Sequence, residues 1–352
     1  MVKLRERTTF AEMGLGGGDL LESDTCIACQ HRCALGQGRT GICGVRMIES
    51  GRLRCIRNYI SHARTDPVER KPIFHFMPGT QVYSIGTVGC NFRCEFCQNH
   101  EISMEYVHYP MTYAPPAMVV RMARSRAAAG IAFTFNEPTV SLEYCRDVSR
   151  LARRKGLYTV FVTNGYLTRE AIDYINPHID AYIVGIKTFD KDFYRRSCGA
   201  DLSKLEMSLT YLSKVADNLE FSYLVRNDDN NIEKFLGFYR SLDRQVPLHL
   251  GKLFPEHLST ETETTTEKLL ECYRIAKEHG LDYVYISDLY GSSYENTYCP
   301  TCGALVIGRE GSIGEPSISL HCAVYQMVSN RLKDGNRCPS CGRDINIRTS
   351  HG

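Results

Sequence analysis

The sequence has almost no net charge and no long apolar run. Lys and Arg together number 42, against 40 Asp and Glu, so no overall field draws the chain to nucleic acid or to an anionic membrane. No segment has eighteen uninterrupted apolar residues, and the first twenty residues have no apolar stretch of signal-peptide length. These absences argue against a membrane protein or an exported protein. They predict a cytoplasmic protein that needs neither a membrane nor nucleic acid as a partner.

Cysteine, in contrast, is abundant. Sixteen cysteines in a chain without an export signal do not indicate disulfides, because the cytosol keeps thiols reduced and short cysteine spacings there indicate metal. Eleven of them fall into three groups and five are isolated. The groups are Cys26, Cys29, Cys33 and Cys43; Cys90, Cys94 and Cys97; and Cys299, Cys302, Cys338 and Cys341; the isolated ones are Cys55, Cys145, Cys198, Cys272 and Cys322.

Short β-rich runs alternate with longer helical segments between the first and last cysteine groups. This pattern is typical of repeated βα units with a parallel sheet. With right-handed crossovers it predicts an α/β fold, a full or partial (β/α)6 TIM-like barrel, while an open doubly wound sheet is the alternative. Strands are expected at 82–88, 131–135, 158–162, 181–187, 220–225 and 247–253, with a seventh at 283–287.

Capping and helix-breaking residues indicate where the helices begin and end. Pro115 and Pro116 open a helix that Gly130 is expected to close. Thr139 is expected to cap a second, and Thr264 with Glu267 forms a capping box for a third. Cys145 and Cys272 fall within helical patterns and are expected to be small core residues.

The chain divides into three parts by composition. Residues 1–80 form a cysteine-rich N-terminal module, 81–295 the barrel, and 296–352 a C-terminal module. In the last part, two Cys-x-x-Cys-Gly knuckles provide four thiols, as in a zinc ribbon, and a segment this short needs metal to fold. The four cysteines of the first part have less regular spacings, and both zinc and an auxiliary iron–sulfur cluster fit them.

The central group lies in TVGCNFRCEFCQN, directly after the first barrel strand. Three thiolates on one short loop ligate three irons of a four-iron cluster and leave the fourth iron open. In radical enzymes the open iron binds the amino and carboxylate groups of S-adenosylmethionine. The alternative is a zinc site that takes a fourth ligand from elsewhere, such as His100.

These residues resemble the radical S-adenosylmethionine superfamily. The likeness extends over CIACQHRCALGQGRTGICGVR, DPVERKPIFHFMPG, GTVGCNFRCEFCQNHEIS, FTFNEPTV, TNGYLT and GLDYVYISDLYG. More narrowly, the chain resembles the radical enzymes encoded beside Memo-like and AMMECR1-like proteins, which are similar to pyruvate formate-lyase activating enzymes. The resemblance implies a [4Fe–4S] cluster, S-adenosylmethionine, and an electron donor such as ferredoxin or flavodoxin. It also implies Memo-like and AMMECR1-like proteins as partners.

The same resemblance implies the cofactor-binding residues at successive strand ends. Glu137 matches the carboxylate that holds the methionyl ammonium, and Gly185 stands where the activases have an aspartate. Two residues on the same side, Arg226 and Cys198, are weaker candidates for a role in catalysis. The full cofactor set is Asn136, Glu137, Thr163, Asn164, Lys187 and His249.

Three functions follow as hypotheses. The first is an enzyme that cleaves S-adenosylmethionine to a 5′-deoxyadenosyl radical and abstracts hydrogen from an unidentified substrate. The second is an activase that installs a glycyl radical on a protein; a barrel mouth closed by the N-terminal module would argue against it. The third is an RNA-binding or RNA-modifying protein that uses its zinc ribbon.

Overall fold

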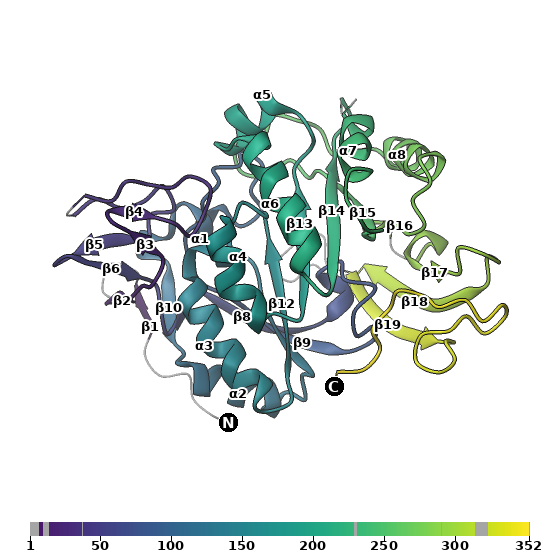
Figure 1. Cartoon of the computed structure of the whole chain (residues 1–352), viewed down its shortest axis with the longest axis horizontal. Coiled ribbons are helices and arrows are strands. Elements are labelled where there is room, and N and C mark those ends of the chain that lie inside the picture. Colours follow the sequence, from purple (N-terminus) through teal and green to yellow (C-terminus); the bar gives the residue numbers. More distant parts are fainter. Residues whose placement is uncertain are drawn as a thin grey trace.

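A single eight-stranded sheet forms the centre of the protein (Figure 1). The computed structural model describes residues 7–9, 14–36, 38–228, 231–289, 291–313 and 323–351. The isolated Cys322 lies outside these ranges. The strands of the sheet are β8 (His62–Pro67), β9 (Gln81–Gly86), β11 (Gly130–Phe133), β12 (Tyr158–Thr163), β13 (Ala181–Ile186), β14 (Leu219–Val225), β15 (Leu248–Lys252) and β16 (Val284–Ile286).

The strand order confirms the predicted barrel in its partial form. From β9 to β16 the seven strands lie side by side in chain order and pair in parallel. β8 pairs antiparallel with β9 and occupies the edge. Among the described residues no ladder joins β16 to β8, so the sheet stays open. Since β8 comes from the segment assigned to the N-terminal module, that module shares a β-hairpin with the barrel.

The strands form because their residues are apolar or β-branched on both faces. β12 reads Tyr-Thr-Val-Phe-Val-Thr, and five of its six residues are buried. Parallel sheets covered by helices require such runs, because neither face meets water. The outer face is covered by α2 (Pro116–Ser125), α3 (Leu142–Arg153), α4 (Arg169–Ile175), α6 (Leu202–Val215), α7 (Ile232–Tyr239) and α8 (Thr266–Glu278).

Three predicted helix boundaries are wrong by a few residues. Gly130 does not close α2, which ends at Ser125, but is the first residue of β11. α3 starts only at Leu142, and Thr139 lies inside a short 3-10 helix, η3 (Pro138–Ser141), that Glu137 caps. The cap of α8 is Thr265. Its neighbour Thr264 instead hydrogen-bonds backbone groups of Val225 and Leu253, because tertiary partners compete with the local cap.

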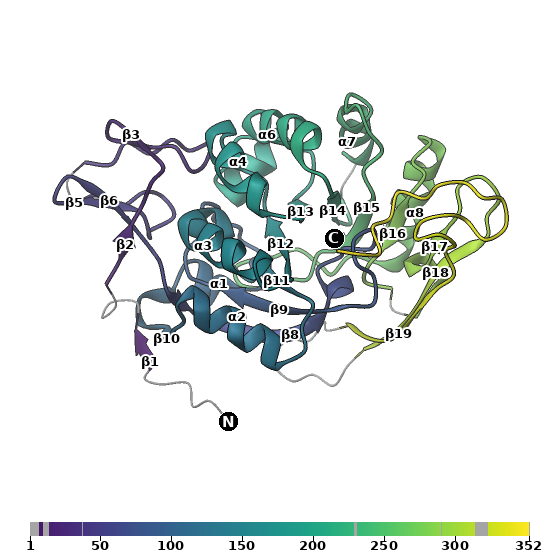
Figure 2. The same cartoon turned by 60° about the horizontal axis from the view of Figure 1, so that its bottom comes forward.

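The two cysteine-rich modules lie at opposite ends of the molecule, the N-terminal one beyond α1 (His100–Ser103) and the C-terminal one beside β16 (Figures 1 and 2). Short antiparallel pieces build both. The N-terminal strands are β2 (Gly16–Gly17), β3 (Leu21–Glu22), β4 (Thr25–Cys26), β5 (Met47–Glu49) and β6 (Arg52–Cys55), and the C-terminal ones are β17 (Thr297–Tyr298), β18 (Leu305–Ile313) and β19 (Ala323–Asn330). A further small sheet joins β1 (Arg7–Thr9), β10 (Pro110–Tyr113) and β7 (Tyr59–Ile60).

A buried ion pair ties the N-terminal module to the barrel. Arg46 donates two hydrogen bonds, of 2.7 and 2.8 Å, to the carboxylate of Glu143 on α3. Burial by itself would raise the pKa of Glu143, but the Arg46 guanidinium holds it at about 2. The pair therefore keeps both charges at neutral pH. Removing one partner would leave an uncompensated buried charge, which couples the module to the barrel.

The isolated cysteines within helices are core residues, as predicted: Cys145 in α3 and Cys272 in α8 are both buried. In the part of the chain that the structure describes, no helix combines the length and the apolar character needed to cross a bilayer.

Candidate active site

The cysteine loop leaves β9 through Gly89, whose φ is +85°. Cys94 is buried, and Cys90 and Cys97 are partly buried. Burial raises the pKa of Cys90 and Cys97, so these thiols stay protonated unless a cation binds them. A metal cluster would remove that cost, because coordinated thiols are deprotonated. The three donors therefore fit an iron–sulfur cluster.

Cys198 supports this loop from behind. It ends the π-helical turn η5 (Tyr194–Cys198), and its carbonyl accepts a hydrogen bond of 2.9 Å from the backbone N–H of Arg93. The pKa of Cys94 is raised, and the largest cause is a hydrogen bond with the Cys198 thiol. Cys198 is completely buried. Its burial and its contacts with the cysteine loop account for Cys198 without a role in catalysis.

Glu137 is the centre of a hydrogen-bond network at the ends of β11 and β12. Its Oε1 accepts from Thr139 N at 3.0 Å, Thr139 Oγ1 at 2.5 Å and Thr163 Oγ1 at 2.7 Å. Its Oε2 accepts one bond from the described residues, 2.7 Å from Asn164 N. Burial nevertheless raises its pKa. The network fixes the carboxylate in one orientation and leaves Oε2 the capacity to accept a bond from a ligand.

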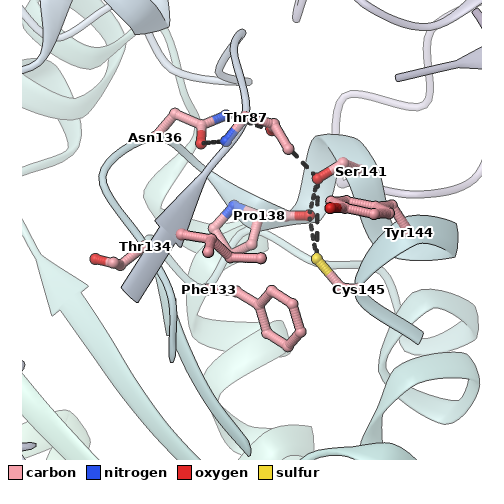
Figure 3. Close-up of a pocket in the computed structure, with 9 residues that line it drawn as sticks. Thr87, Phe133, Thr134, Asn136, Pro138, Ser141, Tyr144 and Cys145 are labelled. Carbon is pink, nitrogen blue, oxygen red and sulfur yellow. Dashed lines mark hydrogen bonds between the residues drawn. The ribbon is translucent and has the colours of Figure 1, made fainter. Parts of the chain in front are cut away.

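The side chains of Asn136 and Asn164 hydrogen-bond to residues of the cysteine loop and hold it in place. Asn136 accepts from Thr87 N and donates to Thr87 Oγ1 and to the Gly89 carbonyl, at 2.8–3.0 Å; Figure 3 shows the Asn136–Thr87 pair. The Asn164 amide donates to Asn91 Oδ1 at 2.7 Å. Asn136 thus has a structural role, since it satisfies backbone groups where β9 turns into the loop.

A pocket lies behind the Asn136–Thr87 pair. This small pocket lies between β9, β11 and α3, and Ser141 lies between Thr87 and Cys145 there (Figure 3). Its walls are mainly apolar residues such as Ile85 and Phe133. It lies behind the strand ends and contains none of the three loop cysteines.

Lys187 lies beside the cysteine loop at the end of β13. Burial is the main cause of the raised pKa of Cys97, and the Lys187 ammonium opposes that rise. A Cβ atom at Gly185 would lie 3.2 Å from Lys187 Nζ. The lysine amine therefore occupies the space beside the position where the activases have an aspartate.

Two predicted residues lie outside this group. His249 is completely buried, with Nε2 2.7 Å from Glu220 Oε2 and Nδ1 3.3 Å from Ser287 Oγ. With both ring nitrogens engaged, it is a satisfied core histidine in this structure. Sequence reasoning missed its partner Glu220, because a glutamate within an apolar strand gives no motif.

Arg226 is likewise engaged. It pairs with Glu261 at 2.7 Å and with Asp228 at 3.0 Å, and its guanidinium lies 4.1 Å from the centre of the Phe193 ring. These contacts account for the residue without a catalytic role.

His100 lies in a second group that the sequence did not indicate. Its ring stacks on that of His257 at 4.4 Å, and Glu105 lies 3.3 Å from His100 Nδ1. The ligand atoms of these three residues all lie within 4.8 Å of one another. His100 thus has partners other than the loop cysteines, which weakens the alternative of a zinc site in that loop.

The C-terminal cysteines converge on one point. The pairs Cys299–Cys341 and Cys302–Cys338 each have sulfurs 3.6 Å apart, and all four sulfurs lie within 4.8 Å of one another. In tetrahedral zinc sites the sulfurs stand about 3.8 Å apart, since Zn–S bonds are about 2.3 Å long. Each knuckle ends in a glycine of positive φ. The four residues can bind a metal ion, and their spacing fits zinc.

We expect this site to hold about one zinc per chain. Replacing all four C-terminal cysteines by Ser should remove that zinc and leave the iron content of the protein unchanged, because the radical site lies elsewhere in the fold. Elemental analysis of the purified variant and parent measures both metals. Unchanged zinc in the variant would contradict the assignment.

Comparison with known proteins identifies the family. The Radical SAM superfamily profile matches residues 84–236. The uncharacterized protein MJ0808 of Methanocaldococcus jannaschii is 35% identical over 333 residues, which cover 92% of this chain and 95% of that protein. This chain belongs to the radical SAM superfamily. It is an enzyme of the radical SAM type, and the family implies a [4Fe–4S] cluster, S-adenosylmethionine and an electron donor.

More distant relatives differ in function. A protein of the same organism provisionally named as a glycyl-radical enzyme activating enzyme, MJ1632, is 23% identical over 55% of this chain and 76% of its own length. A radical SAM methyltransferase from Sphaerobacter thermophilus has a solved structure with a TM-score of 0.49 and 16% identity, over 62% of this chain and 70% of that one. That likeness is too weak to inform the reaction. Membership in the superfamily leaves the substrate open.

Proposed function

We propose that this enzyme cleaves S-adenosylmethionine reductively and uses the resulting 5′-deoxyadenosyl radical to abstract hydrogen from a small organic substrate. Cys90, Cys94 and Cys97 would hold the [4Fe–4S] cluster, which would bind the methionyl group of S-adenosylmethionine and supply the electron for its cleavage. Glu137 would accept a hydrogen bond from the methionyl amino group. Lys187, a neighbour of the cysteine loop, would contact the cofactor through its ammonium group.

The observation that carries this proposal is the network that joins Glu137 to the cysteine loop. Asn164 donates its backbone N–H to Glu137 and its side-chain amide to Asn91, which directly follows Cys90. One rigid unit therefore fixes the position of a carboxylate relative to three thiols. A cofactor whose methionyl amino group would bind iron and also donate a hydrogen bond to a carboxylate requires such a fixed relation.

Packing of the N-terminal module favours a small substrate over a protein. His31 donates to the Asn91 carbonyl at 2.7 Å, Gln30 N donates to the Tyr166 carbonyl at 3.0 Å, and the Arg93 guanidinium donates to the Ile42 carbonyl. The module thus covers one side of the loop that would hold the cluster. A glycyl-radical activase must admit a segment of another protein, so this cover supports the first candidate. The similarity to MJ1632 supports the second candidate, a glycyl-radical activase.

The test is anaerobic incubation of reconstituted enzyme with S-adenosylmethionine and a reductant, followed by mass spectrometry of 5′-deoxyadenosine. Candidate small molecules, Memo-like proteins, AMMECR1-like proteins and a glycyl-radical protein are added in turn, with ferredoxin or flavodoxin as the reductant. We expect 5′-deoxyadenosine release to rise severalfold with a small molecule. A rise only with a glycyl-radical protein would establish the activase instead, and no release under any condition would contradict both.

A further inference from the structure

The four N-terminal cysteines surround a cavity. Cys26, Cys29 and Cys43 are buried and Cys33 is half-buried. Their side chains line one pocket between the module and the barrel. Burial is the main cause of the raised pKa of Cys29, and Cys43 and the other two thiols of the group raise it further. The four thiols therefore face one common pocket.

Their spacing differs from that of the C-terminal group. Among the described residues, no three of these four sulfurs lie within 4.8 Å of one another, whereas all four C-terminal sulfurs do. One tetrahedral zinc ion needs sulfurs about 3.8 Å apart and leaves no cavity between them. Thiolates that each bind a different iron of a cubane stand farther apart around a larger core. We propose that Cys26, Cys29, Cys33 and Cys43 hold a second [4Fe–4S] cluster.

A buried cation lies at the same cavity. Arg46 lines it with a side chain that is 2% exposed. Both terminal nitrogens of the guanidinium bond to Glu143, but the buried Nε has no hydrogen-bond partner. Leaving a buried N–H without a partner is unfavourable, because the group has lost its hydrogen bonds to water. A cluster with four thiolate ligands carries net negative charge, and its sulfurs accept hydrogen bonds. One of these sulfurs would be the partner that Arg46 Nε lacks. The Ile42 N–H, 3.5 Å from the Cys33 sulfur, adds a further donor.

The cavity adjoins the radical site. Its far wall is formed by Thr139 and Val140 of η3, and Thr139 is the residue that donates twice to Glu137. On the other side, Gly89 packs so closely that a Cβ there would lie 2.8 Å from the Cys43 carbonyl. The second cluster is thus separated from the Glu137 carboxylate by one turn of chain. With a thiolate on every iron it has no open position for a ligand, so its role is to hold or pass an electron.

The deciding experiment uses the full chain with Cys90, Cys94 and Cys97 all changed to Ala. This variant leaves the N-terminal cysteines intact. After anaerobic reconstitution we expect it to keep about four irons and four sulfides per chain, half of the parent's content, together with about one zinc. Its reduced cluster should give an EPR signal that S-adenosylmethionine does not alter. A variant with no iron and about two zincs would overturn the proposal.

The reciprocal variant carries Ser at Cys26, Cys29, Cys33 and Cys43. It should lose about half of the parent's iron and keep the signal that responds to S-adenosylmethionine. Cys272→Ser, which changes a buried cysteine of α8, is the matched control and should keep all the iron. If the fourfold variant does not fold, the Ala variant still decides. Failure of the proposed radical chemistry would appear as a parent without an S-adenosylmethionine response, which is a separate result.

Discussion

Replacing Cys90, Cys94 and Cys97 by Ala should abolish the release of 5′-deoxyadenosine. The three residues are the thiols of one loop after β9, and their pKa values are raised by burial or by the neighbouring Cys198 thiol unless metal binds them. Without them no open iron remains to bind the cofactor or to deliver an electron to it. Each single Ala variant should lose the activity as well, because a cubane held by two thiolates leaves two irons without a protein ligand.

The measurement is mass spectrometry of 5′-deoxyadenosine under excess reductant, alongside EPR with and without S-adenosylmethionine. Cys272→Ser is the control, since it removes a buried thiol that lies outside all three cysteine groups and should retain the parent's activity. Activity in the triple variant would place the radical cluster at the N-terminal cysteines and contradict the assignment of this loop.

Changing Glu137 to Ala should weaken binding of S-adenosylmethionine by about tenfold to a hundredfold. The hydrogen bond from a methionyl amino group to a buried carboxylate is charge-assisted and contributes roughly 1.5–3 kcal/mol, and each 1.4 kcal/mol is a factor of ten in affinity. Four protein donors already orient the carboxylate, so little ordering is left to occur on binding. Glu137→Gln keeps the shape but replaces one acceptor oxygen by a donor, and it should have a smaller effect.

Calorimetric titration of reconstituted protein measures the affinity, and iron analysis shows whether the cluster is intact. Iron content should equal that of the parent, because Glu137 is joined to the loop through the hydrogen bonds of Asn164 and is not one of the thiols that would hold the cluster. Glu267→Gln, at an exposed position in the first turn of α8, is the matched control and should bind normally. A Glu137→Ala variant with parental affinity, or one without its cluster, would make Glu137 a structural residue.

Residues whose chemistry is local could be predicted from the sequence. The seven barrel strands follow from continuous β-branched and aromatic runs such as that of β12, which lie buried on both faces. The boundaries that failed, at Gly130 and Thr264, did so because a strand and a tertiary hydrogen bond took residues that local rules assign to helices. β8 was missed because its charged residues, Arg64 and Asp66, hide an edge strand.

The candidate site divides in the same way. Cys90, Cys94, Cys97 and Glu137 were predicted from their motifs, and the structure places Glu137 within the network that also holds the cysteine loop. His249 looked equivalent to them from its place at a strand, but its neighbours in space, Glu220 and Ser287, engage both of its ring nitrogens. Neither neighbour is near it in sequence. No periodicity or spacing could have revealed them.

The sequence by itself determined the radical SAM family and the grouping of the cysteines, because ligand identity and spacing are properties of short segments. Only the tertiary structure separated the two flanking cysteine groups. The C-terminal sulfurs meet within the span of one ion, and the N-terminal sulfurs stand apart around a cavity beside Arg46. That difference depends on distances between loops far apart in the chain, which packing sets and spacing does not. The same physical reason decided that Asn136 secures the loop while Glu137 is held by Thr139, Thr163 and Asn164.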